Sequence, residues 1–219
     1  VDELPYELIS SLVYDLASPN SLVRKTSQLA IEILSDLSSV SKIDLISSCK
    51  TVLLHPIFAK PLRALPFLMQ IGHIEAITYW LGLPHKEAEF NDEMQRLLLE
   101  VVNLVEAEDS MLTTTDRLID YETREQLTEL RVVCINLLTV ALSKPEYTMT
   151  QPGLTRLRIL AVFFKTLGAS EKTIVDASHV GLKSALSQNS KLPRELLQSG
   201  LRPMLMNLSD YRKLSVSNL

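Results

Sequence analysis

The feature that most constrains the fold is an apolar helical pattern that occurs twice between residues 123 and 168. In its first copy, residues 125–142, apolar side chains recur at the spacing of one helix face. That face carries Leu127, Leu130, Cys134, Leu137, Leu138 and Ala141. The opposite side is apolar too, through Val132, Val133, Ile135 and Val140, so we expect a helix buried between neighbours. The second copy, residues 157–167, has the same character and stops at Gly168.

Both helices open with one short pattern: an apolar residue, an arginine, and a small residue three positions after the arginine. The cleanest copies are Leu130-Arg131 with Cys134 and Leu157-Arg158 with Ala161. Less regular copies begin at Leu62-Arg63, which Pro66 follows closely, and at Leu201-Arg202. Repeated openings of apolar helices indicate a degenerate array of helical units.

The composition favours an all-α chain, an α-α superhelix built as a solenoid. Only 6 of 219 residues are glycine, and period-2 alternation is nearly absent. We expect about ten helices joined by short loops in one continuous array over residues 1–219. Its subregions are helical repeats in 1–82, acidic helices in 83–122 and helical repeats in 123–219. The first residue, Val1, and the pattern that continues to Leu219 suggest a piece of a longer chain.

The charge is unevenly distributed along the chain. The net charge is −4, but residues 87–129 carry 13 acidic residues against 3 arginines, whereas residues 154–219 carry 10 basic and 4 acidic residues. The acidic middle argues against nucleic-acid binding there. The basic residues of the last part are scattered, which is typical of a solvated helix face rather than a phosphate-binding stripe.

No chemical motif of an enzyme or a metal site is readable. Cys49 and Cys134 lie in apolar helical patterns and are expected to be buried free thiols in a reducing compartment. His55 and His85 each adjoin a proline and are expected in loops, as surface or cap residues. The acid clusters 106–109 and 116–120 are expected to be solvated. We therefore predict no catalytic, cofactor-binding or metal-binding residue, and no enzyme activity.

Several local predictions set the expected helix boundaries. Helices are expected at 5–17, at 22–37, at 42–54 ending at His55-Pro56, at 59–71 and at 74–81. Others are expected after Asn91, at 116–122, from a Ser170 cap to 187, at 194–199 and at 204–208, with a loop at 144–153. The buried face of 22–37 should contain Val23, Ser27, Ala30, Ile31 and Leu34. Tyr79, Trp80 and Phe90 are expected to pack in the core rather than to form a partner pocket.

Residues 17–34 resemble a HEAT repeat. In that family a first helix ends at a turn of Pro, Asp or Asn, and a second opens with Val-Arg and a small residue three positions later. The matching positions here are Pro19, Asn20, Val23-Arg24, Ser27, Ile31 and Leu34. The small residue lets helices approach closely, and the arginine can reach turn carbonyls and acids of its own or a neighbouring repeat. Asn20 stands where the family often has Asp, which argues against a charged Arg–Asp ladder at this point.

Beyond the repeat, the chain resembles the transformation/transcription domain-associated protein family. These are large pseudokinases related to the phosphatidylinositol-3-kinase-like kinases. The stretches that carry the resemblance are residues 130–138, 158–167 and 190–216, and the last is the most specific. Residues 1–120 fit more loosely, chiefly through 24–34, and the fungal branch fits slightly better than the animal branch.

The resemblance implies a nuclear, non-catalytic scaffold segment. Proteins of this family are subunits of SAGA-type histone acetyltransferase assemblies, hold other subunits and offer a surface to transcriptional activators. Their kinase-like domain would lie outside this chain, and no cofactor, membrane, nucleic acid or small molecule is implied for the segment. Two alternatives remain: a HEAT-type transport receptor that uses the acidic residues 87–129 for basic cargo, and a fragment of an active hydrolase or kinase.

Overall fold

The structure, a computed structural model, describes residues 5–84, 91–113, 120–144 and 156–188, together with residues 194, 198, 202 and 206. Within these ranges it is helical and contains no strand, which confirms the predicted all-α class. The elements are α1 (Tyr6–Asp15), α2 (Ser21–Ser38), α3 (Lys42–Ser48), α4 (Lys50–Phe58), the 3-10 turn η1 (Leu62–Ala64), α5 (Phe67–Gly82), α6 (Asp92–Glu106), α7 (Asp109–Leu112), α8 (Tyr121–Leu142), α9 (Arg156–Thr166) and α10 (Lys172–Gln188).

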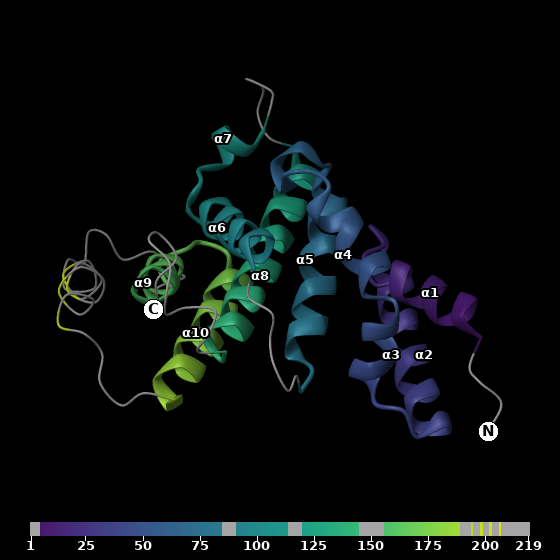
Figure 1. Ribbon diagram of the computed structural model, residues 1–219. Helices are drawn as coiled ribbons and strands as arrows, with labels where there is room; N and C mark the ends of the chain where they lie inside the picture. Colours follow the sequence, from purple (N-terminus) through teal and green to yellow (C-terminus); the bar gives the residue numbers. More distant parts are fainter. Residues whose placement is uncertain are drawn as a thin grey trace.

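The helices stack in a row that follows the order of the sequence, from α1 and α2 at one end to α9 and α10 at the other (Figure 1). α5, α8 and α10 lie side by side, with α8 between the other two. α6 packs against α8 and α9, and α1 packs against α2 and α4. Each helix thus contacts mainly its neighbours in the row, which is the architecture of a solenoid.

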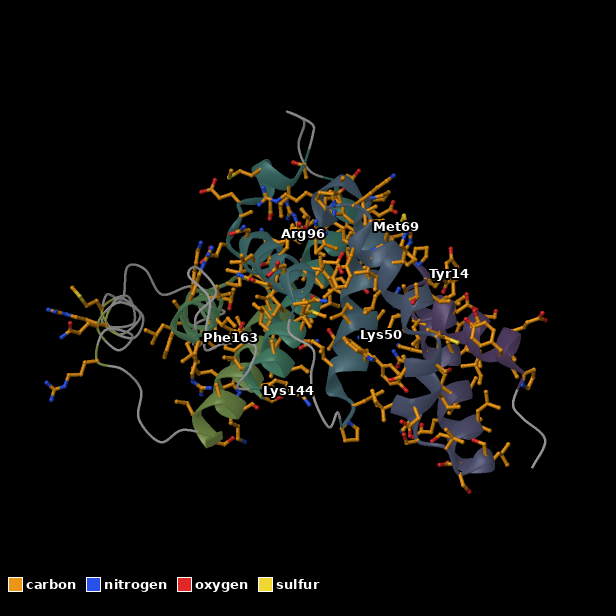
Figure 2. The ribbon with its side chains drawn as sticks, viewed as in Figure 1. Tyr14, Lys50, Met69, Arg96, Lys144 and Phe163 are labelled. Carbon is orange, nitrogen blue, oxygen red and sulfur yellow. The ribbon has the colours of Figure 1, made fainter. Side chains whose placement is uncertain are left out.

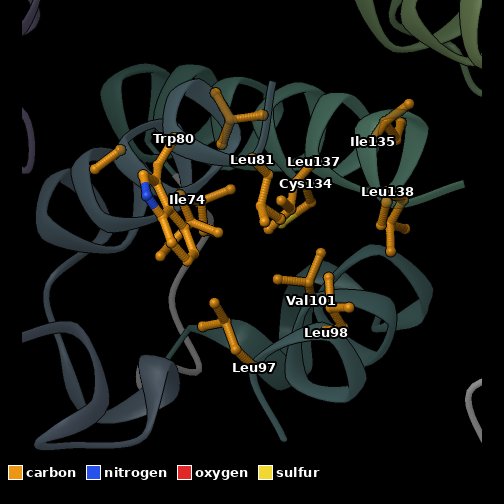
Figure 3. Close-up of a cluster of buried hydrophobic side chains, with 14 of the residues drawn as sticks. Ile74, Trp80, Leu81, Leu97, Leu98, Val101, Cys134, Ile135, Leu137 and Leu138 are labelled. Atoms are coloured by element: carbon orange, nitrogen blue, oxygen red, sulfur yellow. The ribbon is translucent and has the colours of Figure 1, made fainter. Parts of the chain in front are cut away.

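α8 forms the centre of the core, as its apolar pattern predicts. All six residues of the face that begins at Leu127 are buried, and so are Val133 and Ile135 on the other side. Figure 3 shows Cys134, Leu137 and Leu138 of α8 facing side chains of α5 and α6, among them Leu81 and Val101. A helix apolar all round is stable here because it has neighbours on more than one side.

Side chains just before three of the expected helix starts cap these helices. The Oδ1 of Asn20 accepts a hydrogen bond from the backbone N–H of Leu22 at 2.9 Å, and the Oδ1 of Asn91 accepts from Met94 at 2.9 Å. Ser41 caps α3 in the same way, through the N–H of Asp44. These bonds satisfy N–H groups that have no partner inside the helix. The expected starts of α2, α3 and α6 are therefore confirmed.

The expected single helix 42–54 is wrong in two respects. The backbone at Cys49 (φ −117°, ψ 22°) leaves the helical region, so the segment divides into α3 and α4. α4 then continues through Pro56, which was expected to end it. The proline nitrogen removes only the one hydrogen bond that would go to the carbonyl of Val52, near the end of the helix. His55 consequently lies on a helix rather than in a loop, although its side chain is exposed as expected.

The expected pair of helices 59–71 and 74–81 is also wrong. Leu62–Ala64 is a 3-10 turn, and one helix, α5, runs from Phe67 to Gly82. Pro66 precedes the first residue of α5, where a missing N–H has no consequence for the helix. Gly72 is inside α5 rather than at a helix end. A Cβ at Gly72 would lie 2.6 Å from the carbonyl oxygens of Ala17 and Ser18, so the glycine allows α5 to approach the end of α1.

Two further boundaries differ from the predictions, and several predicted segments lie outside the described residues. Asp120 caps α8, so residues 121–122 belong to α8 and not to a separate helix at 116–122, of which 116–119 are not described. α10 begins at Lys172, and the recorded hydrogen bond of the Ser170 hydroxyl goes to the Glu171 carboxylate. Residues 145–153, His85 and Phe90 are outside the described ranges, as is most of 194–208.

Candidate interaction surfaces and the arginine clamps

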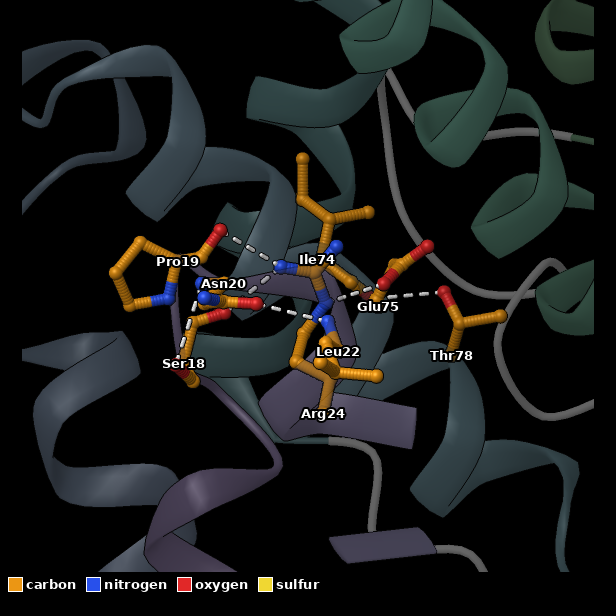
Figure 4. A network of polar contacts seen from close by, with 8 residues as sticks. All are labelled: Ser18, Pro19, Asn20, Leu22, Arg24, Ile74, Glu75 and Thr78. Atoms are coloured by element: carbon orange, nitrogen blue, oxygen red, sulfur yellow. Dashed lines mark hydrogen bonds and ion pairs between the residues drawn. The ribbon is translucent and has the colours of Figure 1, made fainter. Parts of the chain in front are cut away.

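The arginine of the first repeat opening is fully buried. Arg24 of α2 has 1% of its surface exposed, and its Nη1 donates hydrogen bonds to the carbonyl oxygens of Ser18 (2.8 Å) and Pro19 (3.1 Å). Its Nε donates to the carboxylate of Glu75 on α5 (Figure 4). One side chain therefore joins the turn before α2 to a helix about fifty residues further along. The guanidinium group suits this role because it presents several donors in a fixed plane.

The two later openings use their arginines in the same way. Arg131 of α8 forms an ion pair with Asp109 and donates to the carbonyl oxygen of Ala107 at 2.8 Å. Arg158 of α9 donates to Oε2 of Glu106 at 3.1 Å and to Oδ1 of Asn103 at 2.9 Å. We call Arg24, Arg131 and Arg158 with these partners the arginine clamps. The prediction that the arginines reach turn carbonyls and acids is confirmed for Arg24 and Arg131, whereas Arg158 reaches an acid and the side-chain amide oxygen of Asn103.

The acids of the clamps come from places that the sequence pattern did not identify. Asn20 does cap α2 rather than supply a charge, and Glu75, far away in the sequence, takes that part. The cluster 106–109 was expected to be solvated, which holds for the exposed Glu108 but only partly for Glu106 and Asp109, because these two are 35% and 39% exposed and bind arginine. No periodic signal marks them, since each acid is selected by the way helices meet in space.

The cysteines and histidines form no chemical site in the described ranges. Cys49 and Cys134 are buried free thiols, as predicted, and burial raises the pKa of Cys134 far above its usual value. Burial also lowers the pKa of His73, which lies inside α5, whereas His179 is exposed. Among the described residues, no group of three or more His, Cys, Asp or Glu side chains is placed to hold a metal ion.

The predicted core role of the aromatic residues is confirmed for Tyr79 and Trp80, whereas Phe90 lies outside the described residues. Trp80 is 4% exposed and belongs to the central cluster (Figure 3), and Tyr79 packs against that cluster from a half-buried position. None of the helices in the described ranges combines the length and the apolar character needed to cross a membrane.

One surface feature was missed by the sequence analysis: a row of exposed apolar side chains along α2. It comprises Leu22, Leu29, Ile33 and Leu37, which are between 48% and 78% exposed. We call this set the α2 row. Its spacings of seven, four and four place it on one helix face, well away from the buried Ser27 and Ile31. Of the other residues expected on that buried face, Val23, Ala30 and Leu34 are half-buried. The signal was present in the sequence, but only one of the two apolar faces of α2 was interpreted.

Helix pairs that stack side by side and are tied by the arginine clamps define an α-solenoid of the HEAT-repeat type. A family model described as the Tra1 HEAT repeat ring region matches residues 4–219. The chain belongs to this family, the Tra1 or transformation/transcription domain-associated protein family, and forms a HEAT-repeat segment of it rather than a kinase domain.

Relatives of known name support the same assignment. The chain is 47% identical, over 96% of its length, to the SAGA complex/NuA4 acetyltransferase complex subunit TRA1 of Saccharomyces cerevisiae. It is 46% identical, again over 96%, to the subunit Tra1 of Schizosaccharomyces pombe. Identity to the transformation/transcription domain-associated protein of Homo sapiens is 28% over 97% of the chain. The chain spans 6% of the length of the two yeast relatives and 5% of the human one.

Proposed function

We propose that this chain is a non-catalytic scaffold segment of a nuclear transcription coactivator subunit. In this proposal it belongs to a SAGA-type histone acetyltransferase complex and offers surface to activators and to other subunits. The names of the two yeast relatives, both acetyltransferase complex subunits, support the assignment to such a complex. The chain covers a small share of those relatives, which supports its interpretation as one segment of a longer array.

The observation that carries the proposal is the set of arginine clamps. Each clamp fixes one helix to another element of the row, at Glu75, at Asp109 and at Glu106. Charged groups used in this way hold the helices in register and are not free for acid–base chemistry. An array of helices locked in register presents the side chains of its outer faces at fixed distances, which is what a scaffold requires.

Crosslinking of the intact assembly tests this function. Lys25, Lys60 and Lys172 are exposed on α2, at the end of α4 and on α10 respectively. A lysine-reactive crosslinker followed by mass spectrometry should join these lysines to other subunits of an acetyltransferase complex. Crosslinks that stay within the chain, with none to other subunits, would contradict the proposal.

A surface variant adds a test by mutation. Leu29→Glu with Ile33→Glu places two charges in the α2 row, and we expect less of the other subunits to co-purify with the full-length protein. Val180→Glu is the matched control, because Val180 is a similarly exposed apolar residue (61%) on α10. Co-purification that is equal for the two variants would show that the α2 row has no part in assembly.

The transport-receptor alternative is weakened by the internal use of the acidic segment. Glu106 and Asp109 bind Arg158 and Arg131, and Glu100 accepts from the backbone N–H of Leu62 at 2.7 Å. Arginine therefore offsets part of the charge of Glu106 and Asp109, and the Leu62 N–H occupies one oxygen of Glu100, before any cargo arrives. Glu122, Glu125 and Glu129 are exposed, so their change to Lys is the fair test. Loss of basic-peptide binding in that variant, with a normal melt, would support the alternative.

We further propose that the segment has no activity of its own. The one strongly perturbed thiol, Cys134, is fully buried and its pKa is raised, which opposes formation of the reactive thiolate. Turnover of ATP by the purified chain would contradict this part of the proposal. A variant of the chain that loses the turnover is the control, because it excludes a contaminating enzyme.

A further inference from the structure

The α2 row gathers more exposed large apolar side chains than any other helix in the described ranges. Leu29, Ile33 and Leu37 follow one another at intervals of four residues, so they form a continuous strip along the helix. Single apolar residues on a surface are ordinary, but a continuous apolar strip usually marks a contact surface. The α2 row therefore calls for an occupant that packs along α2.

The direction of the α2 row follows from the arginine clamp on the same helix. Arg24 points to α5, where it binds Glu75. Since each residue turns a helix by about 100°, every member of the α2 row lies about 140° to 180° around the helix from Arg24. The α2 row therefore faces away from α5.

That direction continues an interface that the molecule already contains. α10, α8 and α5 lie side by side, and α2 packs next to α5 at the end of the row of helices (Figure 1). Figure 2 shows the same order in labelled side chains, with Tyr14 of α1 toward this end and Phe163 of α9 toward the other. α8 has a helix on each of two sides, whereas α2 has α5 on one side and the exposed α2 row on the other. The α2 row thus stands where the next helix of the row would pack.

The chemistry of the strip suits a helix. Its members are all leucine or isoleucine, the residue types that α8 buries against its neighbours. The exposed Lys25 and Asp36 lie along one edge of the strip, near its two ends. An apolar centre with charges at the edge is the usual anatomy of a protein contact. A matching helix would present aliphatic side chains to the strip, an acid opposite Lys25 and a base opposite Asp36.

The length of the relatives indicates where that helix comes from. The chain spans 6% of the length of the two yeast relatives, and the family model that matches it is described as a ring region of HEAT repeats. Much more polypeptide of the same repeat type is therefore at hand in such proteins. A helix of the same polypeptide is held near the strip by the chain itself, whereas a separate subunit loses its free motion on binding. This difference favours a helix of the same chain.

We propose that, in the full-length protein, the α2 row is covered by a helix of another repeat of the same polypeptide, outside residues 1–219. The inference rests on the proposed function as one segment of a longer array, and it makes this face an internal joint of that array. The lower co-purification expected for the variant with charges at Leu29 and Ile33 then arises because the joint opens and the repeats on its two sides lose their alignment.

Photo-crosslinking identifies the occupant directly. p-Benzoylphenylalanine takes the place of Leu37, the most exposed member of the α2 row at 78%, in the full-length protein within its complex. We expect a crosslink to a segment of the same polypeptide outside residues 1–219, with the mass of a single chain retained. The same probe in place of Tyr121, which is 81% exposed on α8, is the control and should not reach that segment. A crosslink to another subunit, to a second copy or to residues 1–219 would overturn the proposal.

Hydroxyl-radical footprinting adds a test without a bulky probe. It compares three leucines in the full-length protein after the other subunits have been removed: Leu29, the buried Leu138 and Leu68 at the start of α5. In the present structure Leu29 is more exposed than Leu68, 56% against 43%. We expect oxidation of Leu29 to fall to the rate of Leu138, well below that of Leu68. Oxidation of Leu29 at least as fast as that of Leu68 would refute the intramolecular contact.

The outcomes separate this inference from the proposed function. The lysine crosslinks at Lys60 and Lys172 lie on other parts of the chain and do not depend on the α2 row. A crosslink from position 37 to another subunit would end the inference and support the scaffold function. Lysines that link to no other subunit, together with a crosslink from position 37 to the same polypeptide, would do the reverse.

Discussion

α8 and α2 are both rich in leucine and isoleucine, yet their surroundings differ sharply. α8 lies between α5, α6 and α10, and its apolar residues are buried on both sides. α2 buries Val23, Ser27 and Ile31 to different degrees, but its second apolar face, the α2 row, remains exposed among the described residues. The difference teaches that apolar periodicity predicts which faces of a helix are apolar. Whether such a face is buried depends on the position of the helix in the row, which decides whether a neighbouring helix packs on it.

The largest difference in stability should appear when a charge is placed in the buried face of α8 and, for comparison, in the exposed α2 row. Leu138→Asp in α8 would bury an unpaired carboxylate and should cost several kcal/mol, enough to unfold the adjacent helices. Leu29→Asp in the α2 row, a position that is 56% exposed, should cost about 1 kcal/mol or less. Thermal melts of the two variants measure the contrast. Similar losses in both would mean that α2 is covered as α8 is.

The next effect concerns the clamp that ties α2 to α5. Arg24→Ala leaves the carbonyls of Ser18 and Pro19 and the carboxylate of Glu75 without their donor. Since Glu75 is partly exposed, the expected loss is about 2–3 kcal/mol, below that of a fully buried pair. Lys42→Ala, which removes the exposed pair with Glu32, is the control and should leave the melt unchanged. A double variant with Glu75→Ala gives the coupling between the two side chains.

A smaller effect is expected at Gly72, where α5 approaches the end of α1. Gly72→Ala would place a Cβ 2.6 Å from two backbone oxygens, which cannot move away easily, so we expect a loss of about 1–3 kcal/mol. Gly82→Ala at the other end of α5 meets no atom within 4 Å and should be neutral or slightly stabilising. Denaturant melts of this pair compare close packing with helix propensity inside one helix. Equal stability of the two variants would remove the packing argument.

The smallest effect is a pH dependence. Because burial lowers the folded-state pKa of His73, protonation is unfavourable in the native state. Stability should be fully present above the unfolded-state pKa of about 6.5 and should fall as the pH decreases toward 5. His73→Phe should show a smaller decrease in melting temperature between pH 7.5 and pH 5.5 than the unmodified chain. His179→Phe, at an exposed position, should behave as the unmodified chain does.

Much of the fold could be predicted from the sequence, because helical periodicity and capping residues are local signals. The faces of α6 and α8 and the caps at Asn20, Ser41 and Asn91 are of this kind. The division at Cys49 and the passage of α4 through Pro56 could not be predicted, since the neighbouring helices decide whether a local preference is overridden. Gly72 was interpreted as a helix end because close approach between α1 and α5 leaves no periodic trace.

The interaction surfaces were less accessible from the sequence than the helices. The arginines of the clamps were identified from their positions after an apolar residue, but Glu75 was not, because the pairing depends on two helices that meet about fifty residues apart. Surfaces made by one helix are readable in the sequence, and surfaces made between helices require coordinates.

Cys134 is a natural chemical probe of whether the helices of the row stay packed. The thiol sits in the middle of the row, is sealed from solvent and resists ionisation, so a thiol reagent can reach it only when α8 parts from its neighbours. The rate at which the reagent labels Cys134 would then report how often mechanical tension along the row of helices separates α8 from its neighbours.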